Sequence, residues 1–104
     1  MTRLWSLSKN SPAYRVELVA GQHQTITDIC AYQTFLPELA NVPEVITKTI
    51  DSFAAEGCAP GDIDAKRAAE LTNSYVLRFL DQVFGNGPAL SASANPEDII
   101  FAAR

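Results

Sequence analysis

The chain has 104 residues, of which 47% are hydrophobic and 19% are charged. These fractions are typical of globular proteins and exclude a largely disordered chain, and the length allows one domain at most. Twelve acidic residues against eight basic ones give a net charge of −4. This balance disfavours nucleic acid or an anionic membrane as a partner, because both require a clustered basic face.

The first part of the chain predicts a short helix followed by a strand. The helix is expected at about residues 2–9, ahead of Ser11-Pro12, where proline disfavours helix at the preceding position. Residues 14–19 alternate apolar and polar side chains and are rich in β-branched and aromatic types, which predicts a strand that ends before Gly21.

Three further helices are expected, at residues 27–36, 43–56 and 62–84. Thr25 or Thr27 could cap the first, with Asp28 in its first turn. The second has Pro43 at its first helical position and Gly57 after its end, and the third has one apolar stripe and ends at Gly85-Asn86-Gly87-Pro88. Residues 85–104 are expected to form a tail. No apolar run is long enough to span a bilayer.

A single strand leaves backbone hydrogen-bonding groups without partners. Residues 99–102, Ile-Ile-Phe-Ala, are the other candidate strand in the chain, and their pattern is weak. The sequence therefore predicts an α/β fold in which residues 1–104 form a single partial domain, with the strand at 14–19 as the edge of a larger sheet.

His23 is the one histidine, in a loop between the predicted strand and the next helix. Catalytic groups gather beyond the carboxyl ends of strands in open α/β sheets, and imidazole titrates near neutrality, so His23 is a candidate general base. Its position alone favours a solvent-exposed histidine without a role. No metal or cofactor is expected, because one histidine and two distant cysteines are a poor ligand set.

Cys30 and Cys58 permit one disulfide bond, but the composition of the chain alone favours two buried free thiols about equally. The spacing fits neither a zinc site nor a Cys-x-x-Cys redox motif. A disulfide would suggest an exported parent protein, whereas residues 1–8 contain no apolar run typical of a signal peptide. The sequence therefore does not determine the cellular compartment of the protein.

Residues 14–30, Tyr-Arg-Val-Glu-Leu-Val-Ala-Gly-Gln-His-Gln-Thr-Ile-Thr-Asp-Ile-Cys, resemble the last strand, histidine loop and following helix of α/β-hydrolases. They look most like bacterial dienelactone-hydrolase-like and platelet-activating-factor-acetylhydrolase-like esterases. Gly57-Cys58 and the long helix extend this resemblance over roughly residues 4–84. It implies a mostly helical C-terminal piece of such a sheet, with His23 as the triad histidine and Cys30 paired with Cys58.

The other catalytic residues of that family are missing from the sequence. A serine nucleophile would stand in Gly-x-Ser-x-Gly, which does not occur, and both serine and acid would precede His23. Glu17 is the one acid before His23, and it lies within the predicted strand. The expected function is therefore a fragment of a serine hydrolase for carboxylic esters that is inactive alone and meets an ester substrate when the missing part is supplied. The alternative is a non-catalytic helical interaction module, folded alone or as a homo-oligomer such as a homodimer held by exposed apolar helix faces.

Overall fold

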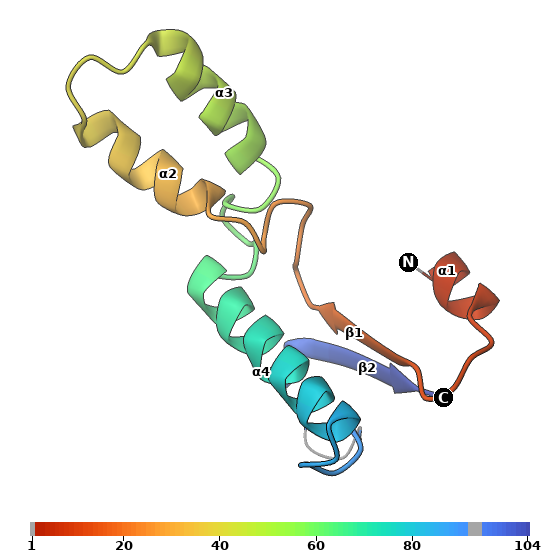
Figure 1. Ribbon diagram of the computed structural model, residues 1–104. Helices are drawn as coiled ribbons and strands as arrows, with labels where there is room; N and C mark the ends of the chain where they lie inside the picture. The colour runs from red at the N-terminus through yellow and green to blue at the C-terminus, as the bar shows by residue number, and fades with distance from the viewer. Residues whose placement is uncertain (1, 92–94) are drawn as a thin grey trace. The chain divides into compact units, whose positions relative to one another are not determined.

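The computed structural model describes residues 2–91 and 95–104 (Figure 1). Within these ranges the fold is mixed α/β, with four α-helices and a two-stranded antiparallel sheet. The chain divides into two compact units, which are described separately. The first unit consists of two stretches, the residues up to Val19 and those from Asn73 onward. The second unit is Ala20–Thr72. Among the described residues, no helix is both long and apolar enough to cross a bilayer.

The sheet of the first unit joins β1 (Tyr14–Leu18) to β2 (Ile99–Ala103), which lie side by side in Figure 1. The strands are antiparallel, with Tyr14 opposite Ala103 and Leu18 opposite Ile99. The predicted strand at 14–19 thus finds one neighbour in its own chain. The expected tail at 85–104 includes this second strand, and three of its residues, 92–94, lie outside the described residues.

Aromatic side chains from both strands pack against the last helix, α4 (Ala65–Val83). The Tyr14 ring meets Phe79 edge-on at 6.2 Å between centroids, and Tyr75 lies 6.4 Å from Phe101. Tyr75 and Ile99 are both buried. These contacts form the core of the first unit, because the alternation of β1 and β2 turns one apolar face of the sheet toward the helix.

The short helix α1 (Thr2–Leu7) is held by one aromatic side chain. The guanidinium of Arg104 lies 4.1 Å from the centre of the Trp5 ring, and that of Arg15 lies 5.7 Å from it. Arg104 also donates a hydrogen bond to the carbonyl of Ser8. Cation–π attraction therefore attaches α1 to β1 and to the residue that directly follows β2. The helix is two residues shorter than expected.

One glutamine side chain links β1 to the segment after α4. The Gln82 Oε1 atom accepts hydrogen bonds from the Tyr14 hydroxyl at 2.9 Å and from the backbone N–H of Leu90 at 3.2 Å. Both donors are part-buried. Removing this acceptor would therefore leave two donors without a partner in a site with limited access to water.

We expect Gln82→Leu to lower the free energy of unfolding by about 2 kcal/mol, because burying unpaired donors carries a desolvation penalty. Tyr14→Phe removes one donor and leaves the acceptor with its second bond, so the expected loss is about 1 kcal/mol. Equilibrium urea denaturation of both variants measures the difference. Equal losses in the two variants would show that the Leu90 contact contributes nothing.

The second unit contains a helical hairpin made of α2 (Ile29–Phe35), the 3-10 turn η1 (Leu36–Glu38) and α3 (Glu44–Ala54) (Figure 1). Both α-helices are shorter than the expected ranges 27–36 and 43–56. Pro43 is extended and occupies the N-cap position rather than the first helical turn. Asp28 likewise precedes α2, instead of lying within its first turn.

The helix α4 begins three residues later than the predicted start at 62. The Asp64 carboxylate accepts a hydrogen bond from the Arg67 N–H at 3.0 Å, as an N-cap residue does, so the first helical residue is Ala65. The helix ends before Gly85, whose φ of 75° suits glycine. The expected stop at this glycine is confirmed.

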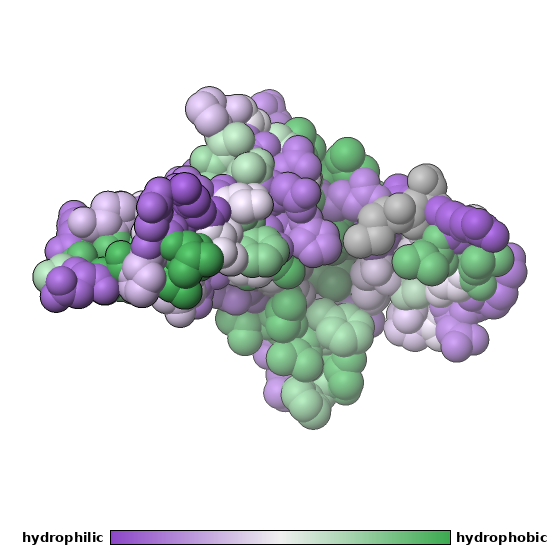
Figure 2. Space-filling model, turned by 90° about the horizontal axis from the view of Figure 1, so that it is seen from above, coloured by the Kyte–Doolittle hydropathy of each residue, from purple (hydrophilic) through white to green (hydrophobic). Residues whose placement is uncertain are grey.

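Large hydrophobic side chains remain on the surface, next to hydrophilic ones (Figure 2). The predicted apolar stripe of α4 is buried at Ala68, Leu71 and Tyr75. Its remaining members are between 39% and 71% exposed: Val76, Phe79, Leu80, Val83 and Phe84. The amphipathic pattern therefore predicts the helix correctly but overstates how much of its stripe this chain covers.

Candidate functional site

His23 lies on a turn that follows β1 in the chain and leads into α2. Its side chain is exposed, and among the described residues it makes no hydrogen bond or ion pair. We call residues 21–28 the histidine turn. An exposed imidazole without a partner is free to contact a group that approaches from outside the chain.

Two hydrogen bonds between Gln22 and Thr25 close the turn that contains His23. The Gln22 N–H donates to the Thr25 hydroxyl at 2.7 Å, and the Thr25 N–H donates back to the Gln22 carbonyl at 3.2 Å. Thr25 is 2% exposed, the one buried polar or charged side chain in the part of the chain that the structure describes. The sequence suggested Thr25 as a helix cap, but its hydroxyl holds the histidine turn instead.

Residues that follow α3 pack directly against the histidine turn. The Gln24 N–H donates to the Glu56 carbonyl at 2.7 Å. Gly57 packs so closely that a Cβ atom there would lie 2.8 Å from the Thr25 nitrogen and 2.9 Å from the Gln24 carbonyl carbon. Gly57 was predicted to end a helix, and its close approach to the histidine turn is an additional role that only the structure shows.

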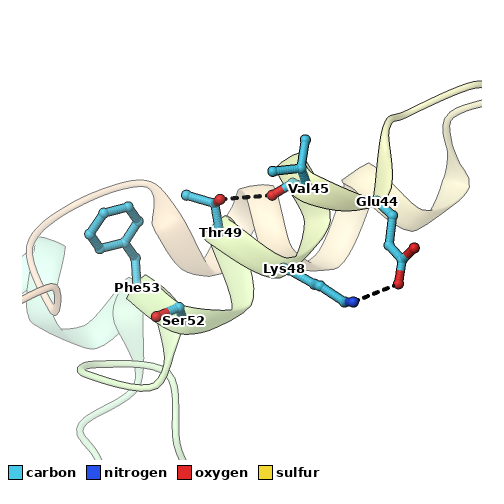
Figure 3. A pocket seen from close by; sticks show the side chains of 6 residues that line it. All are labelled: Glu44, Val45, Lys48, Thr49, Ser52 and Phe53. Atoms are coloured by element: carbon cyan, nitrogen blue, oxygen red, sulfur yellow. Dashed lines mark hydrogen bonds and ion pairs between the residues drawn. The ribbon is translucent and has the colours of Figure 1, made fainter.

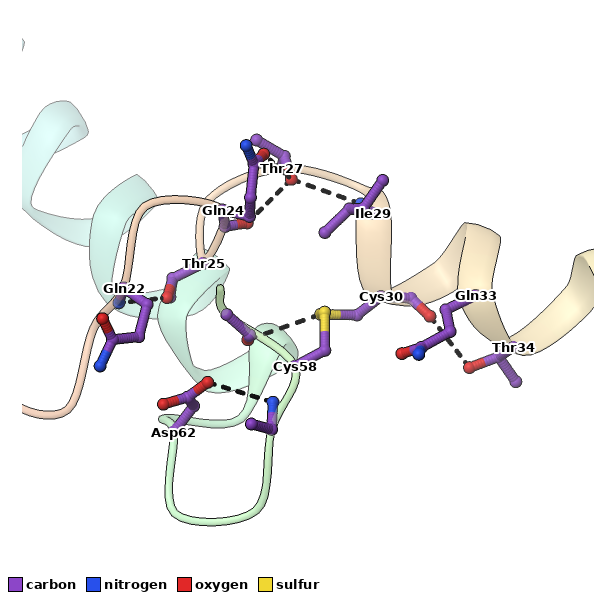
Figure 4. Close-up of a disulfide and its surroundings, with 12 residues drawn as sticks. Gln22, Gln24, Thr25, Thr27, Ile29, Cys30, Gln33, Thr34, Cys58 and Asp62 are labelled. Atoms are coloured by element: carbon purple, nitrogen blue, oxygen red, sulfur yellow. Dashed lines mark hydrogen bonds between the residues drawn. A yellow bond between two sulfur atoms is a disulfide. The ribbon is translucent and has the colours of Figure 1, made fainter. Parts of the chain in front are cut away.

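A disulfide bond joins Cys30 to Cys58, directly beside this contact (Figure 4). The pairing is thereby confirmed, and the alternative of two free thiols is wrong. The bond attaches the start of α2 to the residue after Gly57. The histidine turn is therefore fixed by a covalent link on one side and by backbone packing on the other.

Ala20, the residue directly before the histidine turn, has an unusual backbone conformation. Its φ is 58°, in the left-handed region that residues with a Cβ atom rarely adopt, and its carbonyl accepts a hydrogen bond from the Ile63 N–H at 3.0 Å. Such conformations carry a strain of about 1–3 kcal/mol and cluster at functional sites. The sequence contains no signal for it, since alanine is not a residue type typical of this conformation.

Among the described residues, no acid or nucleophile is bonded to His23. Glu17, the one acid that precedes it, pairs with Arg15 at 3.2 Å, and no hydrogen bond or ion pair joins Asp28 to His23. The Ser6 hydroxyl donates to the Arg3 carbonyl of its own helix. His23 is thus exposed, with no acid or nucleophile bonded to it among the described residues.

Two shallow surface depressions lie in the second unit. One is on α3, where Lys48 pairs with Glu44 at 2.8 Å and the Thr49 hydroxyl donates to the Val45 carbonyl (Figure 3). The other adjoins the histidine turn and is lined by Gln24, Thr27, Asp28, Ile29, Tyr32 and Phe53. Neither brings a nucleophile into hydrogen-bonding distance of a base, and among the described residues no group of three or more His, Cys, Asp or Glu side chains could hold a metal ion.

Comparison with known proteins adds no relative to this description. No protein-family model matches the chain, and no curated protein or solved structure matches it. The functional argument therefore depends on the residues and on the geometry of the histidine turn.

Proposed function

We propose that this chain is the C-terminal part of a serine α/β-hydrolase that acts on carboxylic esters, with His23 as its triad histidine. The single observation that carries the proposal is an exposed imidazole on a turn held by the buried Thr25, the close packing of Gly57 and the adjacent disulfide. A turn held in this way would keep the imidazole in one place relative to an approaching serine. The resemblance of residues 14–30 to the strand–histidine–helix segment of these enzymes agrees with it.

The proposed chemistry is acyl transfer through a serine in polypeptide that this sequence does not contain. His23 would take the proton from that serine as its oxygen attacks the ester carbonyl, and the imidazolium would return the proton to the departing alcohol. Water would then release the acid by the same two proton transfers. The fixed turn would hold the imidazole in position, which matters because misplacing a catalytic group by about 1 Å can lower the rate a hundredfold.

The test begins with the isolated chain and with the reading frame that precedes it. We expect the isolated chain to be inert toward short p-nitrophenyl esters, because it lacks a Gly-x-Ser-x-Gly nucleophile. We expect the preceding DNA to encode that motif and an acidic residue at a strand end. A preceding frame without both would contradict the proposal.

The decisive enzyme is a joined polypeptide, in which the segment encoded upstream is expressed together with this chain. His23→Gln in this joined polypeptide is expected to lower kcat by about a thousandfold or more, because the serine would lose its general base. Far-UV circular dichroism and retention of the Cys30–Cys58 bond serve as the folding control. The matched variant is Gln22→Ala, which alters the neighbouring exposed side chain and leaves the backbone donor of the turn in place. Equal activity of the His23→Gln enzyme and the parent would refute the role of His23.

A second candidate function is a non-catalytic interaction module. It is favoured by the exposed apolar side chains of α3 and α4, among them Val45 at 66%, Leu77 at 61% and Val83 at 58% exposure. This function would not depend on His23. Binding or assembly that persists in a His23→Gln chain, together with no serine motif upstream, would favour it.

A further inference from the structure

The strand β1 has one paired edge and one open edge. Ala13 and Arg104 exchange both backbone hydrogen bonds, at 3.1 and 3.0 Å, and the Val19 N–H donates to the Asp98 carbonyl. Because bonding direction alternates along an antiparallel strand, Arg15 and Glu17 also turn their backbone groups toward β2. The N–H and C=O groups of the alternate residues therefore point away from β2.

Those alternate residues are Tyr14, Val16 and Leu18, and among the described residues their backbone groups make no hydrogen bond. A two-stranded sheet is marginally stable in water, and three or more strands with an apolar face are usually needed. An open strand edge is also a template for pairing with a further strand. The first unit therefore has both a reason and a site for extending its sheet.

The side chains of β1 identify the occupant. In an antiparallel pair of two β1 strands centred on Val16, Arg15 of one copy stands opposite Glu17 of the other, and the reciprocal pair forms by symmetry. Tyr14 stands opposite Leu18 on the other face, so apolar meets apolar. Both sets of open backbone groups are then satisfied.

This register is singled out by the charges. Centring the pair on Tyr14 would place Arg15 opposite Ala13, and centring it on Leu18 would place Glu17 opposite Val19. The Arg15 and Glu17 side chains are 22% and 32% exposed, so their charges are partly shielded from solvent and their pairing partners matter. The edge is thus self-complementary in backbone direction, charge and hydrophobicity.

We propose that two copies of this chain associate through the open edges of β1, forming a continuous four-stranded sheet in the order β2, β1, β1, β2 around a two-fold axis at Val16. The exposed helix faces are not required for this contact. The occupant is a second copy of this chain, and the proposal does not depend on any catalytic role of His23. In a longer hydrolase a strand of the added part would take the same edge, so the dimer is proposed for this chain by itself.

Multi-angle light scattering at about 100 μM should give a mass of twice 11.3 kDa for the purified chain. Val16→Pro is expected to weaken dimerisation about tenfold or more, because proline removes a donor at the open edge and none from the β1–β2 ladder. Ala103→Pro is the matched control, since the Ala103 N–H faces the outer edge of β2. It should remain dimeric.

Charge variants test the register independently of proline. Glu17→Arg should dissociate the dimer because it brings like charges together, and the exchange Arg15→Glu with Glu17→Arg should restore it. A monomeric wild-type chain at 100 μM would overturn the proposal. So would a dimer that survives both Val16→Pro and Glu17→Arg, because the contact would then lie elsewhere, for example on the exposed helix faces.

Discussion

Replacing Cys30 and Cys58 with serine is expected to lower the free energy of unfolding by about 3.5 kcal/mol. The bond closes a loop with a sequence separation of 28, which contains η1, α3 and all of α2 except its first residue. In the chain-entropy account, a cross-link stabilises by restricting the unfolded chain, and the effect grows with the logarithm of loop length. Most of the second unit therefore depends on this bond.

Urea unfolding of the oxidised chain, the reduced chain and the double serine variant measures this contribution. We expect the reduced chain and the double variant to unfold at similar urea concentrations, well below that of the oxidised chain. Reductant should leave the double variant unchanged, which controls for effects unrelated to the bond. A loss below about 1 kcal/mol would show that loop closure is not what the disulfide contributes.

Gly57→Ala is expected to destabilise the protein by about 3 kcal/mol or more and to displace the histidine turn. The added Cβ would lie 2.8 Å from the Thr25 nitrogen, and this neighbour is backbone that cannot rotate away. The φ of Gly57 is 152°, a conformation that residues with a Cβ atom rarely adopt. Clash and strain therefore add at one position, and the nearby Gln24–Glu56 hydrogen bond is expected to break.

Gly61→Ala is the matched control for this experiment. Gly61 has a φ of 95°, but a Cβ there would meet no atom within 4 Å, so the expected loss is about 1–2 kcal/mol of backbone strain alone. Urea unfolding gives the two losses, and amide hydrogen exchange at Gln24 reports on the turn itself. Equal losses in the two variants, with unchanged protection at Gln24, would show that the close approach is unimportant.

The proposed role of His23 depends on the same turn. Gly57→Ala therefore also distinguishes an effect on the position of His23 from an effect on the folding of the whole chain. Near-native far-UV circular dichroism with faster exchange at Gln24 would locate the damage at the turn. In the joined hydrolase, such a variant should lose activity although His23 is intact. Unaltered activity despite a displaced turn would argue against a catalytic requirement for the position of this histidine.

The order and type of most elements could be predicted from the sequence. The strand at 14–19, the helices near 27–36, 43–56 and 62–84, and the stop at Gly85 all follow from local patterns, because hydrophobic periodicity and helix-ending residues act over a few positions. The helix boundaries differ from the predicted ones by a few residues. At α4, for example, the Asp64 carboxylate caps the helix, so it begins at Ala65. His23 could be proposed as a site residue from the resemblance of residues 14–30 to the histidine loop of α/β-hydrolases, and its catalytic role stays a prediction.

Tertiary structure alone decided which distant residues meet. The pairing of β1 with residues 99–103, the choice of a disulfide over free thiols, and the burial of Thr25 against Gly57 all join segments separated by long stretches of chain. Local patterns carry no information about such contacts, because they depend on how whole elements pack and on which backbone groups still lack partners. The residues therefore determined the helices, the strand and the candidate histidine, while long-range packing determined the sheet and the fixed turn around that histidine.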